Sequence, residues 1–192
     1  MTAIDVNASP ASRWKNGAGV TRTVAIWPPH ATLDDFDWRI SIAEVASESA
    51  FSPFPGVDRT ILLLDGCGMM LSFEKSTISL TEPLEPRSFP GEATVQCRPV
   101  SGVSRDFSVM TRRGVVQAEV QIVRSEWGLD KRLDAAVFFC ARGSYRVHDA
   151  GVIEAGWALN FNRPEPGLHF APHAPDAVMI AVLIENLEKR NS

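Results

Sequence analysis

Most of the chain consists of short runs in which apolar and polar residues alternate, the pattern of β-strands that turn one face to a core. In the stretch WRISIAEV, large apolar side chains fall on one side, and Arg39 and Ser41 fall on the other. In the stretch RDFSVMTR the same alternation places Asp106, Ser108 and Met110 on one face. Helical periodicity is almost absent, so the pattern predicts an all-β barrel or sandwich.

The other predicted strands are short apolar or alternating runs separated by Gly, Pro, Asn and Asp. Residues 66–68 (Gly-Cys-Gly) are expected to form a hairpin turn, residues 129–133 a single helical turn, and the Pro-containing residues 82–90 and 163–175 loops. Residues 1–12 are expected to form a tail or an edge strand. The predicted strands are 20–27, 38–45, 59–65, 69–74, 77–80, 93–98, 105–112, 115–124, 135–141, 144–148, 157–161 and 178–185.

One order of elements occurs in both halves of the chain: an apolar run, a glycine turn, a return strand and a short strand. This weak repeat, in topology more than in residues, predicts two small barrels packed as one unit. We place the boundary near Gly114. Residues 1–114 would form an N-terminal barrel with a ligand pocket, and residues 115–192 a C-terminal barrel.

Composition describes an ordinary globular chain. Apolar residues make up 45% of the 192 positions and charged residues 22%, and the formal net charge of −4 with scattered Arg and Lys gives no footprint for nucleic acid. Cys67, Cys97 and Cys140 lie far apart, which indicates free thiols in a reducing compartment. The N-terminus lacks a signal-peptide pattern, and no run is long enough to span a membrane. We expect a cytoplasmic protein without membrane contact.

Motifs for metal, nucleophilic or phosphate chemistry are absent from the sequence. The one close histidine pair, His169 and His173, has Pro172 within it and lies in a predicted loop, where solvated side chains are the alternative to metal ligands. No G-x-S-x-G elbow occurs, and the glycines near residue 17 do not continue into G-x-G-x-x-G. We therefore expect no metal ligands, no catalytic nucleophile and no cofactor.

What remains is a set of polar side chains on otherwise apolar strands and turns. A guanidinium removed from water needs an anionic or carbonyl partner, so two arginines on apolar strands predict a bound small anion. The structural alternative is that Arg39 or Arg59 pairs with Asp58 or Asp106 and only closes the barrel. The candidates for this interior are Lys15, Asn16, Arg39, Ser41, Ser52, Arg59 and Asp106.

Four motifs in register resemble the HutD/Ves family: WKNGAGVTRTVAIWP, FDWRISIAEV, FSPFPGVDRTILLLDGCGMMLSF and DFSVMTRRG. They cover most of the first half, and similarity through the rest is looser. The resemblance implies a bicupin, two cupin barrels of the RmlC-like superfamily in one chain. The family usually reads Asp-Phe-Asn where this chain has Ser108 in the third position, and the shorter side chain there would either change what fits or be neutral.

The resemblance also lets the metal pattern of cupins be tested. Metal-binding cupins carry two histidines two apart, then a glutamate, six residues and a glycine. Six residues separate Arg59 from Gly66, so Arg59 stands at the glutamate position, and Phe54 and Ser52 stand at the histidine positions. A pocket with a cation in place of a divalent metal still favours an anion but cannot perform metal chemistry. We add Phe54 to the ligand-binding set.

HutD members are associated with bacterial histidine utilisation, and Ves members with cold and stress response. The resemblance therefore implies a non-enzymatic protein that binds a small carboxylate, such as a formylglutamate-like intermediate, in a regulatory role. Two alternatives stay open: a metal-independent enzyme that acts on a small acid or sugar with Asp106 as general acid or base, and a protein-interaction module. The resemblance also allows a homodimer paired through sheet edges.

Overall fold

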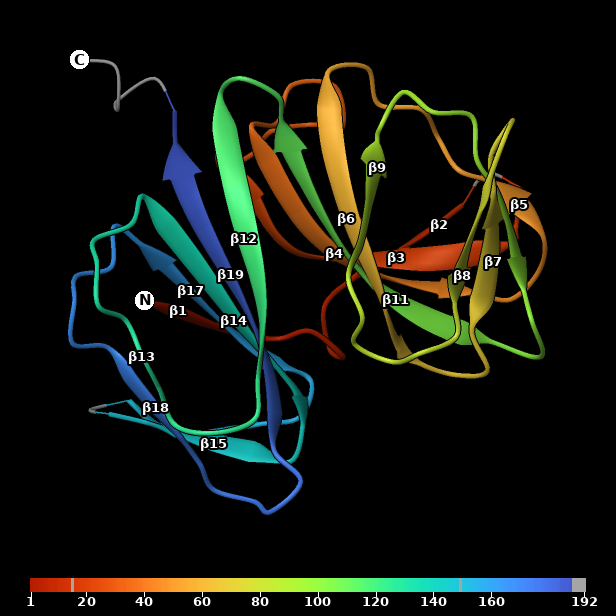
Figure 1. Cartoon of the computed structure of the whole chain (residues 1–192). Helices are drawn as coiled ribbons and strands as arrows, with labels where there is room; N and C mark the ends of the chain where they lie inside the picture. Colours follow the sequence, from red (N-terminus) through yellow and green to blue (C-terminus); the bar gives the residue numbers. More distant parts are fainter. Residues whose placement is uncertain (15, 149, 188–192) are drawn as a thin grey trace. The chain divides into compact units, whose positions relative to one another are not determined.

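The computed structural model describes residues 1–14, 16–148 and 150–187, and every regular element among them is a β-strand (Figure 1). The predicted all-β class is therefore confirmed. Within these residues no helix is long and apolar enough to cross a membrane. The chain divides into two compact units, which are described separately.

The first unit spans residues Pro10–Val115 and contains two antiparallel sheets. The larger sheet has the order β2-β3-β4-β11-β6-β9, with β2 Ala11–Arg13, β3 Gly19–Trp27, β4 Trp38–Val45, β11 Ser104–Arg112, β6 Val57–Asp65 and β9 Arg87–Pro90. The smaller has the order β5-β10-β7-β8, with β5 Ser49–Ala50, β10 Gln96–Pro99, β7 Met69–Ser72 and β8 Thr77–Leu80.

The second unit contains residues 1–9 and the described chain after residue 115, again in two sheets. One has the order β1-β17-β14-β19-β12, with β1 Thr2–Asp5, β17 Trp157–Asn162, β14 Ala135–Arg142, β19 Val178–Asn186 and β12 Val116–Val123. The other has the order β13-β18-β15-β16, with β13 Trp127–Gly128, β18 His169–Pro172, β15 Ser144–Val147 and β16 Gly151–Glu154.

The internal repeat predicted from the sequence is present as identical strand order. The neighbours β4-β11-β6-β9 in the first unit correspond to β12-β19-β14-β17 in the second. Each strand of the second unit comes eight strands after its counterpart in the chain. The smaller sheets correspond in the same way, β5-β10-β7-β8 to β13-β18-β15-β16. Each unit thus consists of two facing sheets in a jelly-roll arrangement, which confirms the expected bicupin of two cupin-like barrels or jelly rolls.

Apolar side chains fill the space between the two sheets of each unit. In the first unit the core includes Ile61, Leu63, Leu71 and Cys97, all with an exposed fraction of 1% or less. In the second unit aromatic rings dominate, and the centroids of Phe138 and Phe170 lie 4.4 Å apart. The alternating residues of the strands supply these cores, as the sequence pattern indicated.

The predicted turn at residues 66–68 is present between β6 and β7. Gly66 has a φ of 95°, a left-handed conformation that favours glycine, and a Cβ there would lie 2.6 Å from the carbonyl oxygen of Val103. A side chain at this position is therefore excluded both by conformation and by space.

Four local predictions were wrong. Strands β9 and β18 lie inside segments that we expected to be loops, because prolines at strand ends and on short edge pairings do not prevent a ladder. The expected helical turn at residues 129–133 is irregular chain instead. Thr2–Asp5, which we assigned to the N-terminal domain of residues 1–114, pairs with β17 of the second unit.

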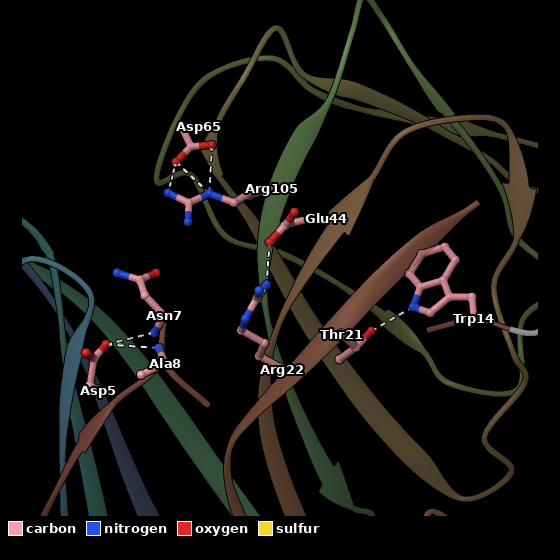
Figure 2. A network of polar contacts seen from close by, with 9 residues as sticks. All are labelled: Asp5, Asn7, Ala8, Trp14, Thr21, Arg22, Glu44, Asp65 and Arg105. Carbon is pink, nitrogen blue, oxygen red and sulfur yellow. Dashed lines mark hydrogen bonds and ion pairs between the residues drawn. The ribbon is translucent and has the colours of Figure 1, made fainter. Parts of the chain in front are cut away.

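Charged side chains on one face of the larger sheet in the first unit pair with one another (Figure 2). Arg105 on β11 is the cross-strand neighbour of Glu44 on β4 and of Asp65 on β6, and its guanidinium contacts the Asp65 carboxylate through Nε at 3.0 Å. Glu44 in turn accepts a hydrogen bond from Arg22 on β3. These pairs are half-exposed, and Arg39 and Arg59 lie on the opposite face of the same sheet.

Candidate ligand-binding site

Strand register brings the two predicted arginines into one row. On the central strand β11, Met110 lies directly across from Arg39 on β4 and from Arg59 on β6. Arg59 also lies opposite Phe89 on β9. Residues in one cross-strand row project to the same side of a sheet, so both guanidinium groups emerge on one face.

The next two rows on that face add further polar groups. In the strand register, Ser108 lies across from Ser41 on β4, and Asp106 lies across from Ala43 on the same strand. All of these polar residues are buried: the exposed fraction is 8% for Arg39, 6% for Arg59, 3% for Ser41 and Ser108, and 2% for Asp106. We call these five residues the polar island. It confirms the predicted sharing of a face by Asp106, Ser108 and Met110.

Apolar residues surround the polar island on the same sheet face. Ile61 and Leu63, which follow Arg59 at two-residue spacing on β6, belong to the main core of the unit. Val57, which precedes Arg59 at the same spacing, packs in a second small cluster with Met110 and Phe36. The island therefore interrupts a continuous apolar interior, which small β-proteins avoid unless the position serves a ligand or a satisfied network.

Arg59 contacts three aromatic rings and has no hydrogen-bond or ion-pair partner among the described residues. Its Cζ lies 4.9 Å from the ring centroid of Phe51, 5.2 Å from that of Phe89 and 5.7 Å from that of Phe54. Its Nε is buried without a hydrogen-bond partner, and no described residue forms an ion pair with it. Burial lowers the pKa of Arg59 to about 10, so the group is still a cation at neutral pH.

Arg39 is positioned by two hydroxyl groups. Its Nη2 donates to Thr23 Oγ1 at 2.9 Å and its Nη1 donates to Ser41 Oγ at 3.3 Å. Burial lowers the pKa of Arg39 as well. Two neutral acceptors orient the guanidinium but do not neutralise it, so the row carries two cations.

Asp106 is the acidic member of the polar island. Its Oδ2 is buried without a hydrogen-bond partner, and so is Ser108 Oγ. Burial raises the pKa of Asp106 to about 7, and the positive charge of Arg59 opposes that rise. The nearby Cys97 thiol is neutral, because burial raises its pKa to about 12.

The structural alternative of simple barrel-closing ion pairs was wrong. Asp58 pairs with the exposed Arg113, with an Oδ1–Nη2 distance of 2.7 Å. Asp106 pairs with neither buried arginine within the part of the chain that the structure describes. Arg39 and Arg59 therefore form no ion pair with an acidic side chain among the described residues.

Two other predicted site residues lie away from the polar island. Asn16 is exposed, and its side chain donates to Ser49 Oγ at 2.6 Å and accepts from the Ala18 backbone N–H. Ser52 is exposed, and its side chain makes no hydrogen bond to a described residue. Phe54 does contact Arg59, as a ring rather than as a polar ligand. Lys15 lies outside the described residues.

The sequence reasoning missed three contacts of the arginines. Phe89 was assigned to a loop, and Phe51 was treated as part of an irregular segment, so neither ring was placed beside Arg59. Thr23 escaped notice because a β-bulge between Thr23 and Ala25 shifts its register against β4. The only sequence signal for this contact was the position of Thr23 in the predicted strand 20–27.

No group of three or more His, Cys, Asp or Glu side chains among the described residues is arranged to hold a metal ion. The second unit has a shallow hollow of about 240 Å³, lined by His148, Phe161, Pro164, Glu165, Gly167 and Leu168. Glu165 there is engaged by the exposed Arg132. Among the described residues, the polar island gathers three buried polar atoms without a hydrogen-bond partner: Arg59 Nε, Asp106 Oδ2 and Ser108 Oγ.

Two jelly-roll units with one strand order, and an arginine-containing interior in the first, define a double cupin-like β-protein. The sequence model of the HutD family matches residues 6–164. The chain belongs to the HutD family, as its motifs indicated.

Relatives agree with this assignment. Protein Ves of Escherichia fergusonii is 37% identical over 123 residues, which are 64% of this chain and 63% of that protein, and Protein Ves of Citrobacter koseri matches to the same extent. The match thus spans less than two thirds of these curated relatives.

Solved structures show the same fold. A conserved protein of unknown function from Pseudomonas aeruginosa PAO1 has a TM-score of 0.84 at 27% identity, covering 96% of this chain and 98% of that one. HutD from Pseudomonas fluorescens SBW25, in a formate condition, has a TM-score of 0.83 at 23% identity with the same coverage. A cupin barrel protein from Leptotrichia buccalis has a TM-score of 0.60 at 12% identity, covering 96% of each chain.

Proposed function

We propose that this protein binds a small carboxylate at Arg39 and Arg59 and acts as a binding protein rather than as an enzyme. The observation that carries the proposal is Arg59, a cation with an exposed fraction of 6% that has neither an ion pair nor a hydrogen bond to a described residue. An unpaired charge in an apolar interior is strongly unfavourable. A carboxylate that accepts hydrogen bonds from the guanidinium groups would supply the missing partner.

The charges of the polar island favour an anionic ligand. Two guanidinium groups carry +2 when Asp106 is protonated and leave +1 when it is ionised, so the site can balance a dicarboxylate or a monocarboxylate. Ser108 Oγ and Asp106 Oδ2 have no hydrogen-bond partner among the described residues, so they are available to orient the polar remainder of the ligand. The rings of Phe51, Phe54 and Phe89 would exclude water around the ion pair and strengthen it.

Family membership suggests which acids to consider. HutD proteins are associated with histidine utilisation, whose intermediates include urocanate, formiminoglutamate and formylglutamate. We propose a formylglutamate-like acid as ligand and a regulatory role in that process. The formate condition of the Pseudomonas fluorescens structure adds formate to the acids worth testing.

A thermal-shift screen tests the proposal. The protein is heated with urocanate, formiminoglutamate, N-formylglutamate, glutamate, formate and neutral sugars at equal ionic strength. A ligand at about 100 times its Kd should add about 2.7 kcal/mol, which is several degrees in Tm for a chain of this length. A carboxylate-specific shift supports the proposal. No shift with any acid contradicts it and favours the protein-interaction module.

A second candidate, a metal-independent enzyme, is favoured by one observation. A carboxyl group with a pKa of about 7 is suited to general acid–base work at neutral pH. Turnover of a formylated glutamate or a sugar that disappears in Asp106→Asn would support it. Turnover that persists in this variant would rule out the role of Asp106.

A further inference from the structure

Asp106 lies on the same sheet face as the two buried arginines, and no other Asp or Glu among the described residues is buried. It lies on the same face of β11 as Met110, two rows from the row of Arg39 and Arg59. Its exposed fraction is 2%, and its Oδ2 has no hydrogen-bond partner. A carboxylate ligand bound at Arg59 would therefore lie in the same apolar interior as the carboxyl group of Asp106.

The groups that face Asp106 come from three neighbouring strands. Arg59 on β6 is the cation whose charge lowers the pKa of Asp106. Arg39 on β4 lies across Met110 from Arg59, in the same row. Cys97 on β10 is neutral, with a pKa raised by burial. Ser41 and Ser108 carry no charge. The state of Asp106 thus depends on burial, on Arg59 and on whatever anion Arg59 binds.

We infer that binding of a carboxylate at Arg59 is coupled to the uptake of one proton by Asp106. The inference rests on the proposed function, because it describes how that site responds to its ligand. The proton comes from solvent, and it adds to a carboxylate oxygen of Asp106 to give a neutral carboxylic acid. That group can then donate a hydrogen bond to the ligand instead of repelling it.

The direction of the coupling follows from electrostatics. A bound anion partly neutralises Arg59, which opposes the rise in the Asp106 pKa, and it adds like-charge repulsion. Both effects favour the protonated form, so the pKa of Asp106 rises above about 7 when the ligand binds. Between the free and the bound pKa, affinity should fall by up to about tenfold per pH unit as pH rises. Below that window Asp106 is protonated in both states and affinity should be constant.

Isothermal titration calorimetry tests this coupling. N-formylglutamate and formate are titrated into the full chain between about pH 6 and pH 8.5, in Tris and in HEPES, whose enthalpies of ionisation differ. We expect uptake of close to one proton per site above pH 7, seen as a buffer-dependent heat, and a matching loss of affinity. Neither probe titrates in this range, so the proton must come from the protein's side of the complex.

Two variants assign the proton. Asp106→Asn should bind with an affinity that does not change between pH 6 and pH 8.5 and with no buffer-dependent heat. Asp58→Asn removes an exposed carboxylate on β6 that is paired with Arg113, and it should keep the coupling of the wild type. If N-formylglutamate or formate binds without proton uptake, or if Asp106→Asn retains the uptake, the coupling is overturned while carboxylate binding stands. If neither acid binds at any pH, the proposed function fails and the coupling with it.

Discussion

Arg59 on β6 and Asp106 on β11 project from neighbouring strands to the same face of one sheet, and they do not form an ion pair. The register explains why. Arg59 lies across from Met110 and Asp106 lies across from Leu63, so the two residues are two rows apart, or roughly 13 Å along the strands. Their charges influence each other, but Arg59 Nε and Asp106 Oδ2 have no hydrogen-bond partner among the described residues.

Arg59→Leu should abolish carboxylate binding while leaving the fold intact. Leucine fills most of the space among the three phenylalanine rings and removes a buried charge that lacks a partner, so Tm should stay unchanged or rise. Calorimetry for binding and circular dichroism for folding measure the two effects. Arg98→Leu, at an exposed arginine of β10, is the matched control and should bind normally. Unaltered affinity in Arg59→Leu would refute the role of Arg59.

Asp106→Asn should increase stability in a pH-dependent way. The folded-state pKa of about 7 lies above the ordinary value of 3.8, so ionisation of Asp106 in the fold costs stability as pH rises between these values. The cost grows by about 1.4 kcal/mol per pH unit in that window and is constant above it. The difference in Tm between variant and wild type should therefore be small near pH 4 and largest from pH 7 upward. An equal difference at every pH would show that ionisation is not responsible.

Ser108→Ala should separate stability from binding. The hydroxyl is buried and has no hydrogen-bond partner among the described residues, so its removal should leave the free energy of unfolding unchanged or raise it by about 1 kcal/mol. If the ligand uses this hydroxyl, its affinity should fall by about fivefold to tenfold. Urea denaturation and calorimetry give the two numbers. A lower stability with unchanged affinity would mean that the hydroxyl has a structural role instead.

Thr23→Val tests whether the orientation of Arg39 matters for binding. The substitution keeps the shape of the side chain but removes the acceptor that lies 2.9 Å from Arg39 Nη2. Affinity should fall by about fivefold, because the guanidinium must be reoriented when the ligand binds. Ser12→Ala, at an exposed hydroxyl of the neighbouring strand β2, should bind like the wild type. Equal affinity in Thr23→Val would show that the ligand orients Arg39 unaided.

Several features of the site were predictable because they depend on strand periodicity. Alternation alone placed Arg39 with Ser41, and Asp106 with Ser108 and Met110, and the structure confirms both groupings. The spacing between Arg59 and Gly66 also identified the cation at the usual glutamate position of a metal-binding cupin. Asn16 and Ser52 entered the same set as polar residues of predicted turns, with Ser52 also at the position of a cupin histidine, and the structure leaves both exposed.

The sequence by itself determined which residues share a face, because the two-residue period of a strand is local and needs no partner. It also determined the class of fold and the repeat of one strand order, through the regular spacing of apolar runs and turns. Only the tertiary structure decided which strands are neighbours, and therefore that Met110 separates Arg39 from Arg59 and that Asp106 stays unpaired. Register between distant strands depends on packing over the whole unit, so no local pattern specifies whether two buried charges will meet.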